Sequence, residues 1–456
     1  MITIKTDSRK IKPGDTFVAV KCELNDGHKY VEKAIENGAS FIVAEHGEYS
    51  VPTKIVKDTR KYLEDTLKSE YAYIFDKLKL IGITGTNGKT TTAYITQKVL
   101  NKLGIKTAYI GTIGYYIDEK ILPLPNTSPD IADLYELFVD AYEKGCEYVV
   151  LEASSQGLDG GRLHGLEFNY AVFTNLTQDH LDYHKTMENY ANAKRILFDN
   201  LKSDGKSILN IDDENYKRYV TPNNITYGFN EADYQITSYE LDPCYSVFKY
   251  RHNNIEHEIK LSIPGKHNIY NALVAIIILE ETNNKYEDFK DVMMKLDSPD
   301  GRMNTIKYKD SSIIIDYAHT PDAVEKIISA AHEMTKGDIY TVFGCTGDRD
   351  RTKRPIMTNI VTNLSKKAVI TVDDLHNEEI DQILDDMLKG LKNTNYEIEL
   401  DRKEAIRKGM SYLKKDDILL ILGKGHEEFI IVKDQKIPHN DMKAVKEIIE
   451  EENTSN

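Results

Sequence analysis

The segment Gly85-Thr86-Asn87-Gly88-Lys89-Thr90-Thr91 carries the residue types of a phosphate-binding loop. Its two glycines let backbone N–H groups turn toward an anion and approach it closely. Lys89 can reach the outer phosphates of a nucleoside triphosphate, and the Thr90 hydroxyl can hold Mg²⁺. The strict Walker pattern is not met, because Ile83 stands where its first Gly belongs. A plain strand-to-helix turn does not need Lys-Thr after its last Gly, so the sequence predicts an ATP-type site.

Three other side chains could serve a magnesium site. Glu152 follows an apolar run and offers a carboxylate, the kind of oxygen ligand that Mg²⁺ prefers. His180 and His184 are spaced i, i+4, which would also suit zinc, but no Cys accompanies them. For His180 a ligand role and a solvated loop histidine are equally compatible with the pattern, and for His184 we favour the solvated histidine. Lys194 lies on an amphipathic helix, where the pattern alone predicts a surface lysine.

Two loops near the carboxyl end could recognise an amino acid. The segment Gly347–Arg351, with Lys353 and Arg354 just after it, is rich in charge, and an Arg of this loop could bind a carboxylate in a bidentate manner. The segment Gly423–Glu427 places backbone donors beside the Glu427 carboxylate, which could meet an amine. The sequence therefore favours ATP in one domain and a zwitterionic small molecule in another.

Alternating strands and helices must position these groups. Strands are predicted at 80–83, 107–110, 148–151, 171–174 and 207–210, with helices such as 91–103 between them, and 220–260 is predicted to be antiparallel. A second series, 312–315, 339–343, 368–372 and 417–422, ends each time in a polar loop. Ligands of parallel sheets gather at the carboxyl ends of the strands. The acidic tail 447–456 is expected to fray.

The fold class predicted is α/β with three domains. Residues 1–78 form a small N-terminal α/β domain, 79–300 a central parallel-sheet domain with the phosphate-binding loop, and 301–456 a doubly wound, Rossmann-like domain. A chain of 456 residues exceeds the size at which one core keeps growing.

Composition narrows the partners. A net charge of −15 argues against a general binder of nucleic acid or membrane surfaces. No apolar run reaches membrane-spanning length, and no secretory signal is visible. The four cysteines form no C-x-x-C pair, which fits a reducing cytoplasm. We expect a cytoplasmic monomer that acts on small molecules.

In order along the chain, these motifs resemble the Mur ligases, most closely their MurE type. The resemblance covers essentially the whole length and rests on Asp7–Arg9, Thr84–Thr92, Asn126–Asp130, Glu152–Ser155, Phe173–His184, Tyr190–Lys194, Asn268–Asn271, Gly301-Arg302, Asp316–Pro321, Gly344–Pro355 and Gly423–Glu427. It implies an ATP-dependent ligation in which the D-Glu carboxylate of UDP-MurNAc-L-Ala-D-Glu is phosphorylated and an amino acid displaces phosphate, during peptidoglycan synthesis.

The resemblance also implies roles for single residues. Phosphates of ATP would bind at Gly85, Thr86, Asn87, Gly88, Lys89, Thr90 and Thr91, with Asn268, Arg302 and Asp316 as further ATP contacts. Mg²⁺ would be held by Thr90, Glu152, His180 and Lys194, the last as a carbamate. The muramyl dipeptide would meet Ser8, the loop Glu23–Asn25, Asn126, Thr127, Ser128, Ser154 and Arg162. The amino acid would meet Arg349, Gly423 and Glu427.

The chain departs from the family pattern at three places. Gln156 replaces the His of a Ser-Ser-His segment, and Asn304 follows Gly-Arg-Met. Diaminopimelate-type enzymes carry Asp-Asn-Pro-Arg, whose Arg takes the distal carboxylate, where this chain has Asp373-Asp374-Leu375-His376. Acids dominate this part of the chain, namely Asp373, Asp374, Glu378 and Glu379. Because acids favour a distal ammonium over a carboxylate, we expect the segment Asp373–His376 to select L-lysine or another diamine.

Three alternatives stay open. The same ligase could use meso-diaminopimelate, with His376 as its carboxylate ligand. The chain could be a folylpolyglutamate-synthetase-like ligase, although Asp7–Arg9 and Asn126–Asp130 fit a UDP-muramyl substrate better. A non-catalytic binding paralogue is disfavoured because Lys89, Thr90, Glu152, His180 and Lys194 are all retained.

Overall fold

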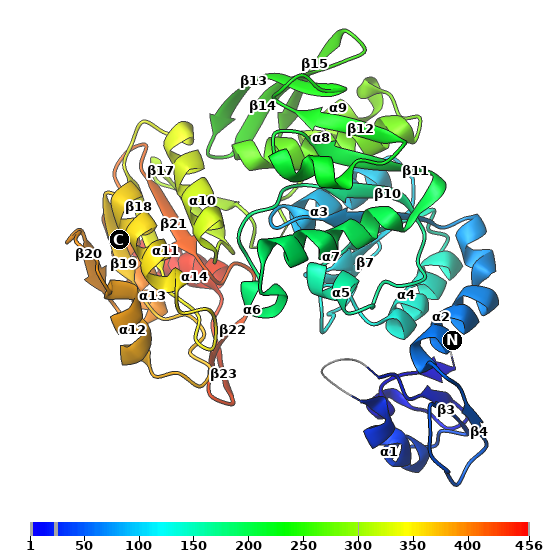
Figure 1. Ribbon diagram of the computed structural model, residues 1–456. Helices are drawn as coiled ribbons and strands as arrows, with labels where there is room; N and C mark the ends of the chain where they lie inside the picture. Colours follow the sequence, from blue (N-terminus) through cyan, green and yellow to red (C-terminus); the bar gives the residue numbers. More distant parts are fainter. Residues whose placement is uncertain (1–2, 22–25, 300, 455–456) are drawn as a thin grey trace. The chain divides into compact units, whose positions relative to one another are not determined.

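The computed structural model describes residues 3–21, 26–299 and 301–454 (Figure 1). The loop Glu23–Asn25, expected to contact the dipeptide, lies outside the described residues. The chain divides into two compact units. Unit 1 contains residues 1–85, 96–176 and 183–226, and unit 2 contains residues 86–95, 177–182 and 227–456. The domain boundaries expected at 78/79 and 300/301 stay predictions.

Unit 1 begins with a small parallel sheet in the order β1-β2-β3-β4. Its core is made of Phe17, Ile42 and their buried apolar neighbours. The elements up to the second sheet are β1 (Ile4–Lys5), η1 (Ser8–Lys10), β2 (Thr16–Val18), η2 (Gly27–Tyr30), α1 (Val31–Glu36), β3 (Phe41–Ala44), β4 (Thr53–Ile55), α2 (Thr59–Glu70) and η3 (Ala72–Asp76).

The second sheet of unit 1 holds strands in the order β11-β10-β5-β9-β6-β7-β8. The first five are parallel to one another, and β7 and β8 are antiparallel additions. Its strands are β5 (Lys79–Thr84), β6 (Thr107–Gly111), β7 (Gly114–Tyr116), β8 (Lys120–Leu122), β9 (Tyr148–Glu152), β10 (Phe168–Phe173) and β11 (Leu201–Asn210). The helices along this stretch are α3 (Lys89–Lys102), α4 (Ile131–Glu143), α5 (Ser155–Asp159), α6 (Leu181–His184), α7 (Met187–Asp199) and η4 (Glu214–Tyr219). The parallel core expected from the alternation is therefore confirmed.

Unit 2 carries an antiparallel ribbon followed by a second parallel sheet. The ribbon contains β13 (Tyr234–Asp242), β14 (Tyr245–His252) and β15 (Ile255–Leu261), packed with α8 (Lys266–Glu281) and α9 (Tyr286–Met293). It is preceded in the chain by β12 (Asn224–Gly228), whose residues are divided between the two units. The antiparallel pairing of β13, β14 and β15 agrees with the prediction for 220–260, whereas β12 pairs with β13 in parallel.

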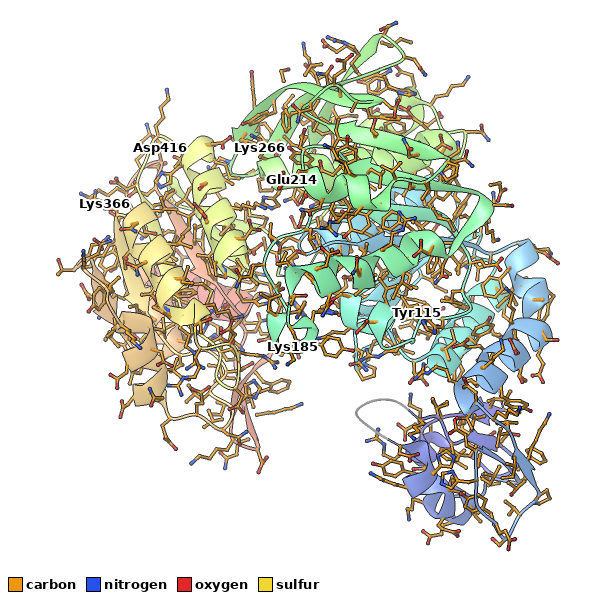
Figure 2. The ribbon with its side chains drawn as sticks, viewed as in Figure 1. Tyr115, Lys185, Glu214, Lys266, Lys366 and Asp416 are labelled. Atoms are coloured by element: carbon orange, nitrogen blue, oxygen red, sulfur yellow. The ribbon has the colours of Figure 1, made fainter. Side chains whose placement is uncertain are left out.

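The six-stranded sheet of unit 2 has the order β16-β17-β21-β18-β19-β20, and only β16 runs antiparallel to its neighbour. The elements of this part of the chain are β16 (Asn304–Tyr308), β17 (Ser311–Asp316), α10 (Pro321–Met334), β18 (Ile339–Phe343), α11 (Lys353–Leu364), β19 (Lys367–Ile370), α12 (Ile380–Leu388), β20 (Tyr396–Ile398), α13 (Arg402–Ser411), β21 (Ile418–Leu422), β22 (Phe429–Val432), β23 (Gln435–Pro438) and α14 (Asp441–Thr454). Strands β22 and β23 form a separate antiparallel pair. Lys366 and Asp416 precede β19 and β21, so they mark the amino edge of this sheet (Figure 2). The polar loops follow the strands at the opposite edge.

The expectation that 447–456 frays is wrong for its described part, because α14 continues to Thr454. Val445 and Ile448 of this helix are fully buried in the apolar core that it shares with α13. An apolar stripe along the helix therefore holds the acidic tail against the unit.

A buried ion pair joins α13 to the start of α14. Arg402 donates to both carboxylate oxygens of Asp441 at 2.8 Å, and it also donates to the carbonyls of Val372 and Leu422. Burial by itself would raise the pKa of Asp441, but the Arg402 guanidinium holds it well below the ordinary 3.8. Since the folded state lowers this pKa, the pair stabilises unit 2 above about pH 4 and loses that effect as the pH falls further.

We expect Asp441→Asn to lower the free energy of unfolding by about 3–5 kcal/mol, because Arg402 is left buried without its counter-charge. Urea denaturation at neutral pH measures the loss. Asp434→Asn is the matched control, since Asp434 is exposed in the turn between β22 and β23. Equal midpoints for the two variants would contradict the prediction.

Candidate active site

The phosphate-binding loop crosses from unit 1 into unit 2. Gly85, at the end of β5, has φ 151°, and a Cβ there would lie 1.8 Å from Thr174 Oγ1. Gly88 has φ 88°, and its Cβ would lie 2.7 Å from Asn271 Oδ1. No larger residue fits at either position without displacement of its neighbour. The loop is therefore a backbone cradle of the kind that suits the phosphates of ATP, as its sequence predicts.

Within unit 2, the loop side chains are tied to neighbouring residues. Lys89 donates to the Thr86 carbonyl at 2.9 Å, and the Thr86 hydroxyl donates to the carbonyl of Thr177. Asn87 Nδ2 donates to Asp322 Oδ2 at 2.7 Å. Asp322 is in the first turn of α10. No sequence motif predicts its contact with Asn87, because 235 positions separate the two residues.

Asn268 and Asn271 form one network on the first turns of α8. Asn271 Nδ2 donates to Asn268 Oδ1 at 2.9 Å, and Thr92 Oγ1 donates to Asn271 Oδ1 at 3.0 Å. Both asparagines are buried. This network holds the start of α3 beside α8, and Thr90 and Thr91 are buried on the same turn of α3.

Glu152 ends β9 and is fully buried in unit 1. Its Oε1 accepts hydrogen bonds from the Tyr109 hydroxyl and from the Thr112 backbone N–H, and its Oε2 accepts one from the Thr112 hydroxyl at 3.2 Å. A buried carboxylate at the carboxyl end of a strand in a parallel sheet offers the oxygen ligands that Mg²⁺ prefers, so the residue type and its position fit a magnesium ligand. Tyr109 and Thr112 are on and after the neighbouring strand β6, and no motif in the sequence indicates them.

Lys194 is 1% exposed, so the surface lysine predicted from the helix pattern is wrong. Its Nζ donates to the Gly85 carbonyl at 3.0 Å and lies 4.1 Å from the centre of the Tyr190 ring. The side chain therefore points from α7 to the phosphate-binding loop, within unit 1.

The two histidines of the i, i+4 pair differ in environment. His180 has φ 53°, its side chain is 42% exposed, and its Nε2 lies 3.5 Å from Asp179 Oδ2. His184 is 4% exposed and shares a hydrogen bond of 2.9 Å with Ser155 Oγ, so the solvated loop histidine favoured for it is wrong. Its ring packs against Tyr183 and Tyr190, and those contacts bury it.

Most residues expected at the dipeptide meet in unit 1. The Ser128 hydroxyl shares a hydrogen bond of 2.9 Å with that of Ser154, and Arg162 donates to the Ser128 carbonyl at 3.1 Å. Thr127 is linked by its hydroxyl to Thr112, and Asn126 is exposed beside them in the chain. Ser8 is buried elsewhere in the unit, where its carbonyl accepts a hydrogen bond from Asn37.

Asp316 is at the carboxyl end of β17 and accepts hydrogen bonds from the backbone N–H groups of Met303 and Ala318. Burial raises the pKa of Asp316 above 3.8, although Arg302 opposes that shift. The Arg302 guanidinium stacks over the Tyr317 ring at 4.9 Å, and its buried Nε has no hydrogen-bond partner among the described residues. An unsatisfied buried donor of this kind suits an anionic ligand.

Three of the residues expected at the amino acid, Asp373, Asp374 and Glu427, lie around Lys424, whose side chain is fully buried, whereas Arg349 is exposed and His376 half-buried in their own loops. The Lys424 Nζ lies 3.5 Å from Asp373, 2.9 Å from Asp374 and 2.7 Å from Glu427. Gly423 has φ 111°, and a Cβ there would lie 2.5 Å from Asp373 Oδ2. These three carboxylates are close enough to hold a metal ion, but the Lys424 ammonium already lies among them. The two acids that were expected to attract a diamine are therefore paired within the protein.

The phosphate cradle follows β5 of a parallel sheet, and the chain also carries a second doubly wound sheet, a combination that is typical of ATP-using enzymes of the α/β class. Family models for the Mur ligase catalytic domain, the Mur ligase middle domain and the Mur ligase glutamate ligase domain match residues 2–73, 83–279 and 301–425. The chain belongs to the Mur ligase family, and it has that family's three-domain α/β architecture.

Known relatives span almost the whole chain. The UDP-N-acetylmuramoyl-L-alanyl-D-glutamate–2,6-diaminopimelate ligase 1 of Clostridium acetobutylicum is 41% identical, covering 98% of this chain and 94% of the relative. The corresponding ligase of Clostridium tetani is 41% identical with the same coverage. A solved structure of a ligase with that same name superposes with a TM-score of 0.72 at 29% identity, covering 99% of this chain and 95% of the other.

Proposed function

We propose that this ligase adds meso-diaminopimelate to the D-Glu carboxylate of UDP-MurNAc-L-Ala-D-Glu, with release of ADP and phosphate. The observation that carries the proposal is the full-length similarity to relatives named for that reaction, at 41% identity. The carboxylate attacks the γ-phosphate of ATP and forms an acyl phosphate. The amine of the amino acid then displaces phosphate, which completes the amide bond.

In this proposal the phosphate-binding loop does the positioning. The N–H groups of Gly85–Thr91 orient the phosphates, and Lys89 neutralises charge that develops on the transferred group. By the family resemblance, Thr90 and Glu152 would hold one Mg²⁺, and His180 with carbamylated Lys194 would hold a second. Bound Mg²⁺ would supply charge neutralisation at the phosphate oxygens. Asn268, Arg302 and Asp316 bind the rest of ATP.

The other two substrates have their own residues in the proposal. Ser8, Asn126, Thr127, Ser128, Ser154 and Arg162 bind the UDP-muramyl dipeptide. Arg349, Gly423 and Glu427 bind the amino acid at its shared carboxylate and amine. The enzyme would act in the cytoplasm as a monomer. In the part of the chain that the structure describes, no helix is long and apolar enough to cross a membrane.

The relatives support diaminopimelate better than the L-lysine expected from the Asp373–His376 segment. The lysine hypothesis needed free acids to receive a second ammonium. Instead Asp373 and Asp374 face Lys424, Glu378 pairs with Arg354, and Glu379 lies 3.5 Å from Lys433. His376 then supplies the donor for the distal carboxylate in place of the family's Arg.

We expect His376→Arg to raise kcat/KM for meso-diaminopimelate about tenfold, because a guanidinium donates two parallel hydrogen bonds to a carboxylate. His376→Ala should lower the same constant, with little change in the KM for ATP. Steady-state kinetics with meso-diaminopimelate and L-lysine measure both effects. His332→Ala, on the exposed side of α10, is the control. If His376→Ala left the preference between the two amino acids unchanged, His376 would not be a specificity residue.

The proposed reaction is tested by ADP release from purified protein given UDP-MurNAc-L-Ala-D-Glu and a panel of amino acids. ADP release that depends on meso-diaminopimelate supports the proposed reaction. Faster turnover with L-lysine would show instead that lysine is the amino acid that is added. Release with a folate substrate in place of the muramyl dipeptide would indicate a folylpolyglutamate-synthetase-like ligase. ATP binding without release under every condition would indicate a non-catalytic paralogue.

A further inference from the structure

Three arginines lie in or just after the loop between β18 and α11, and the structure separates their roles. Arg351 donates to both oxygens of Asp386 on α12, at 2.7 and 3.0 Å. Arg354 is 1% exposed and is also held by carboxylates. Arg349 is exposed and forms no ion pair with any residue in the described ranges 3–21, 26–299 and 301–454. Arg349 is therefore the arginine of this loop that can bind an external anion.

Glu378 links this loop to the segment that carries His376. Its carboxylate accepts two parallel hydrogen bonds from Arg354, at 2.7 and 2.8 Å, and a third from the backbone N–H of Asp348 at 2.7 Å. The hydrogen bonds from Arg354 lower the pKa of Glu378. The Glu378 carboxylate, two residues after His376, thus holds Asp348, the residue directly before Arg349.

A second set of contacts fixes the same two segments. Asn377 donates from its backbone N–H and from Nδ2 to Asp348 Oδ2, at 3.2 and 2.7 Å. The Gly347 N–H donates to the Asp374 carbonyl at 2.7 Å, and a Cβ on Gly347 would lie only 2.0 Å from the Leu375 carbonyl. Asp348 and His376 both hold positive φ angles, 52° and 49°. Such conformations persist only where surrounding contacts impose them.

We propose that Glu378 is a positioning residue that fixes the separation between Arg349 and His376, and so selects the amino acid by its length. The inference rests on the proposed function, in which these two side chains receive the two ends of the amino acid. An amino acid of the right length contacts Arg349 and His376 at the same time, whereas a shorter amino acid loses one of these two contacts. Loss of the Glu378 contacts lets the segments move apart and weakens this discrimination.

The test is Glu378→Gln, compared with Glu379→Gln. Gln keeps the size of Glu378 but loses its charge, and its NH₂ group replaces the oxygen that accepts from Arg354 Nη1, so the paired contact with Arg354 is broken. Glu379 is the matched control, because its side chain is 78% exposed and lies 3.5 Å from Lys433 only at its tip. We measure kcat and KM for ATP, for meso-diaminopimelate and for the analogue one methylene shorter.

For Glu378→Gln we expect the KM for meso-diaminopimelate to rise about tenfold, the KM for ATP to stay within about twofold, and the preference over the shorter analogue to fall. Glu379→Gln should match the unchanged protein. A wild-type protein inactive with every amino acid refutes the proposed function instead. If the wild-type protein is active and Glu378→Gln keeps the wild-type preference for the longer amino acid, the positioning role of Glu378 is refuted. If that variant does not fold, Glu378→Asp keeps the charge but withdraws the carboxylate by one methylene from Arg354 and the Asp348 N–H, and an unchanged length preference in that variant overturns the proposal equally.

Discussion

Lys89→Met should lower kcat by about 10³-fold, which corresponds to about 4 kcal/mol of transition-state stabilisation. Lys89 is the first residue of α3, directly after the glycine whose φ is 88°. Its Nζ lies 2.9 Å from the Thr86 carbonyl, so the ammonium is held over the loop that would cradle the phosphates. Phosphoryl transfer depends on positioning and on charge neutralisation, and Met removes the charge while it keeps the length of the side chain.

Single-turnover formation of ADP measures this effect on the first chemical step. Lys102→Met is the matched control, because Lys102 is exposed at the other end of the same helix. Circular dichroism and the KM for the muramyl dipeptide should be the same in both variants. A Lys89→Met protein that keeps more than about a tenth of the wild-type rate would contradict the role of Lys89 at the transferred phosphate.

Lys194→Met should lower kcat by about 10²-fold or more, even with bicarbonate added, since Met cannot form a carbamate. The proposed modification joins the Nζ of a neutral amine to the carbon of CO₂ and releases a proton, which turns a cation into an anionic oxygen ligand. The 1% exposure of Lys194 and its 3.0 Å contact with the Gly85 carbonyl place the unmodified side chain at the phosphate-binding loop, where a carbamate could act as a metal ligand. A side chain in solvent on α7 would have had no such neighbour.

The carbamate has a signature that does not depend on activity. Protein equilibrated with ¹³C-bicarbonate should show a carbamate carbon resonance that is absent from Lys194→Met and present in Lys217→Met, a variant of an exposed lysine in η4. An equal signal in both variants would assign it to another amine. Full turnover of Lys194→Met would show that the modification, if formed, has no catalytic role.

Local patterns were sufficient for the elements and for the phosphate-binding loop. Val, Ile and Leu runs bounded by Gly or polar residues predicted the strands that became β5, β6, β9, β18 and β21, because a strand buried on both faces needs a continuous apolar run. The order of motifs along the chain was also enough to indicate the Mur ligase family, which the relatives confirm.

At Lys194 the family resemblance and the helix pattern led to opposite predictions. The resemblance assigned Lys194 to the site against the helix pattern, and the structure buries this side chain. The spacing of apolar residues predicts which face of a helix is buried. The buried face of α7 nevertheless includes Lys194, whose Nζ donates to the Gly85 carbonyl more than a hundred positions earlier in the chain. No spacing rule contains that contact.

Only the tertiary structure decided how the charges are paired. Asp373 and Asp374 suggested a site for a second ammonium, yet Lys424, 50 positions later, already lies 2.9 Å from Asp374. His184, which was predicted to be solvated, is instead buried and hydrogen-bonded to Ser155. Arg354 is bound by Glu378 and Asp386, whereas Arg349 of the same loop is exposed. The sequence by itself determined the family and the phosphate cradle, since both depend on neighbours in the chain. Which charges remain available for a substrate depends on burial and on partners brought together by folding, and that was settled in three dimensions.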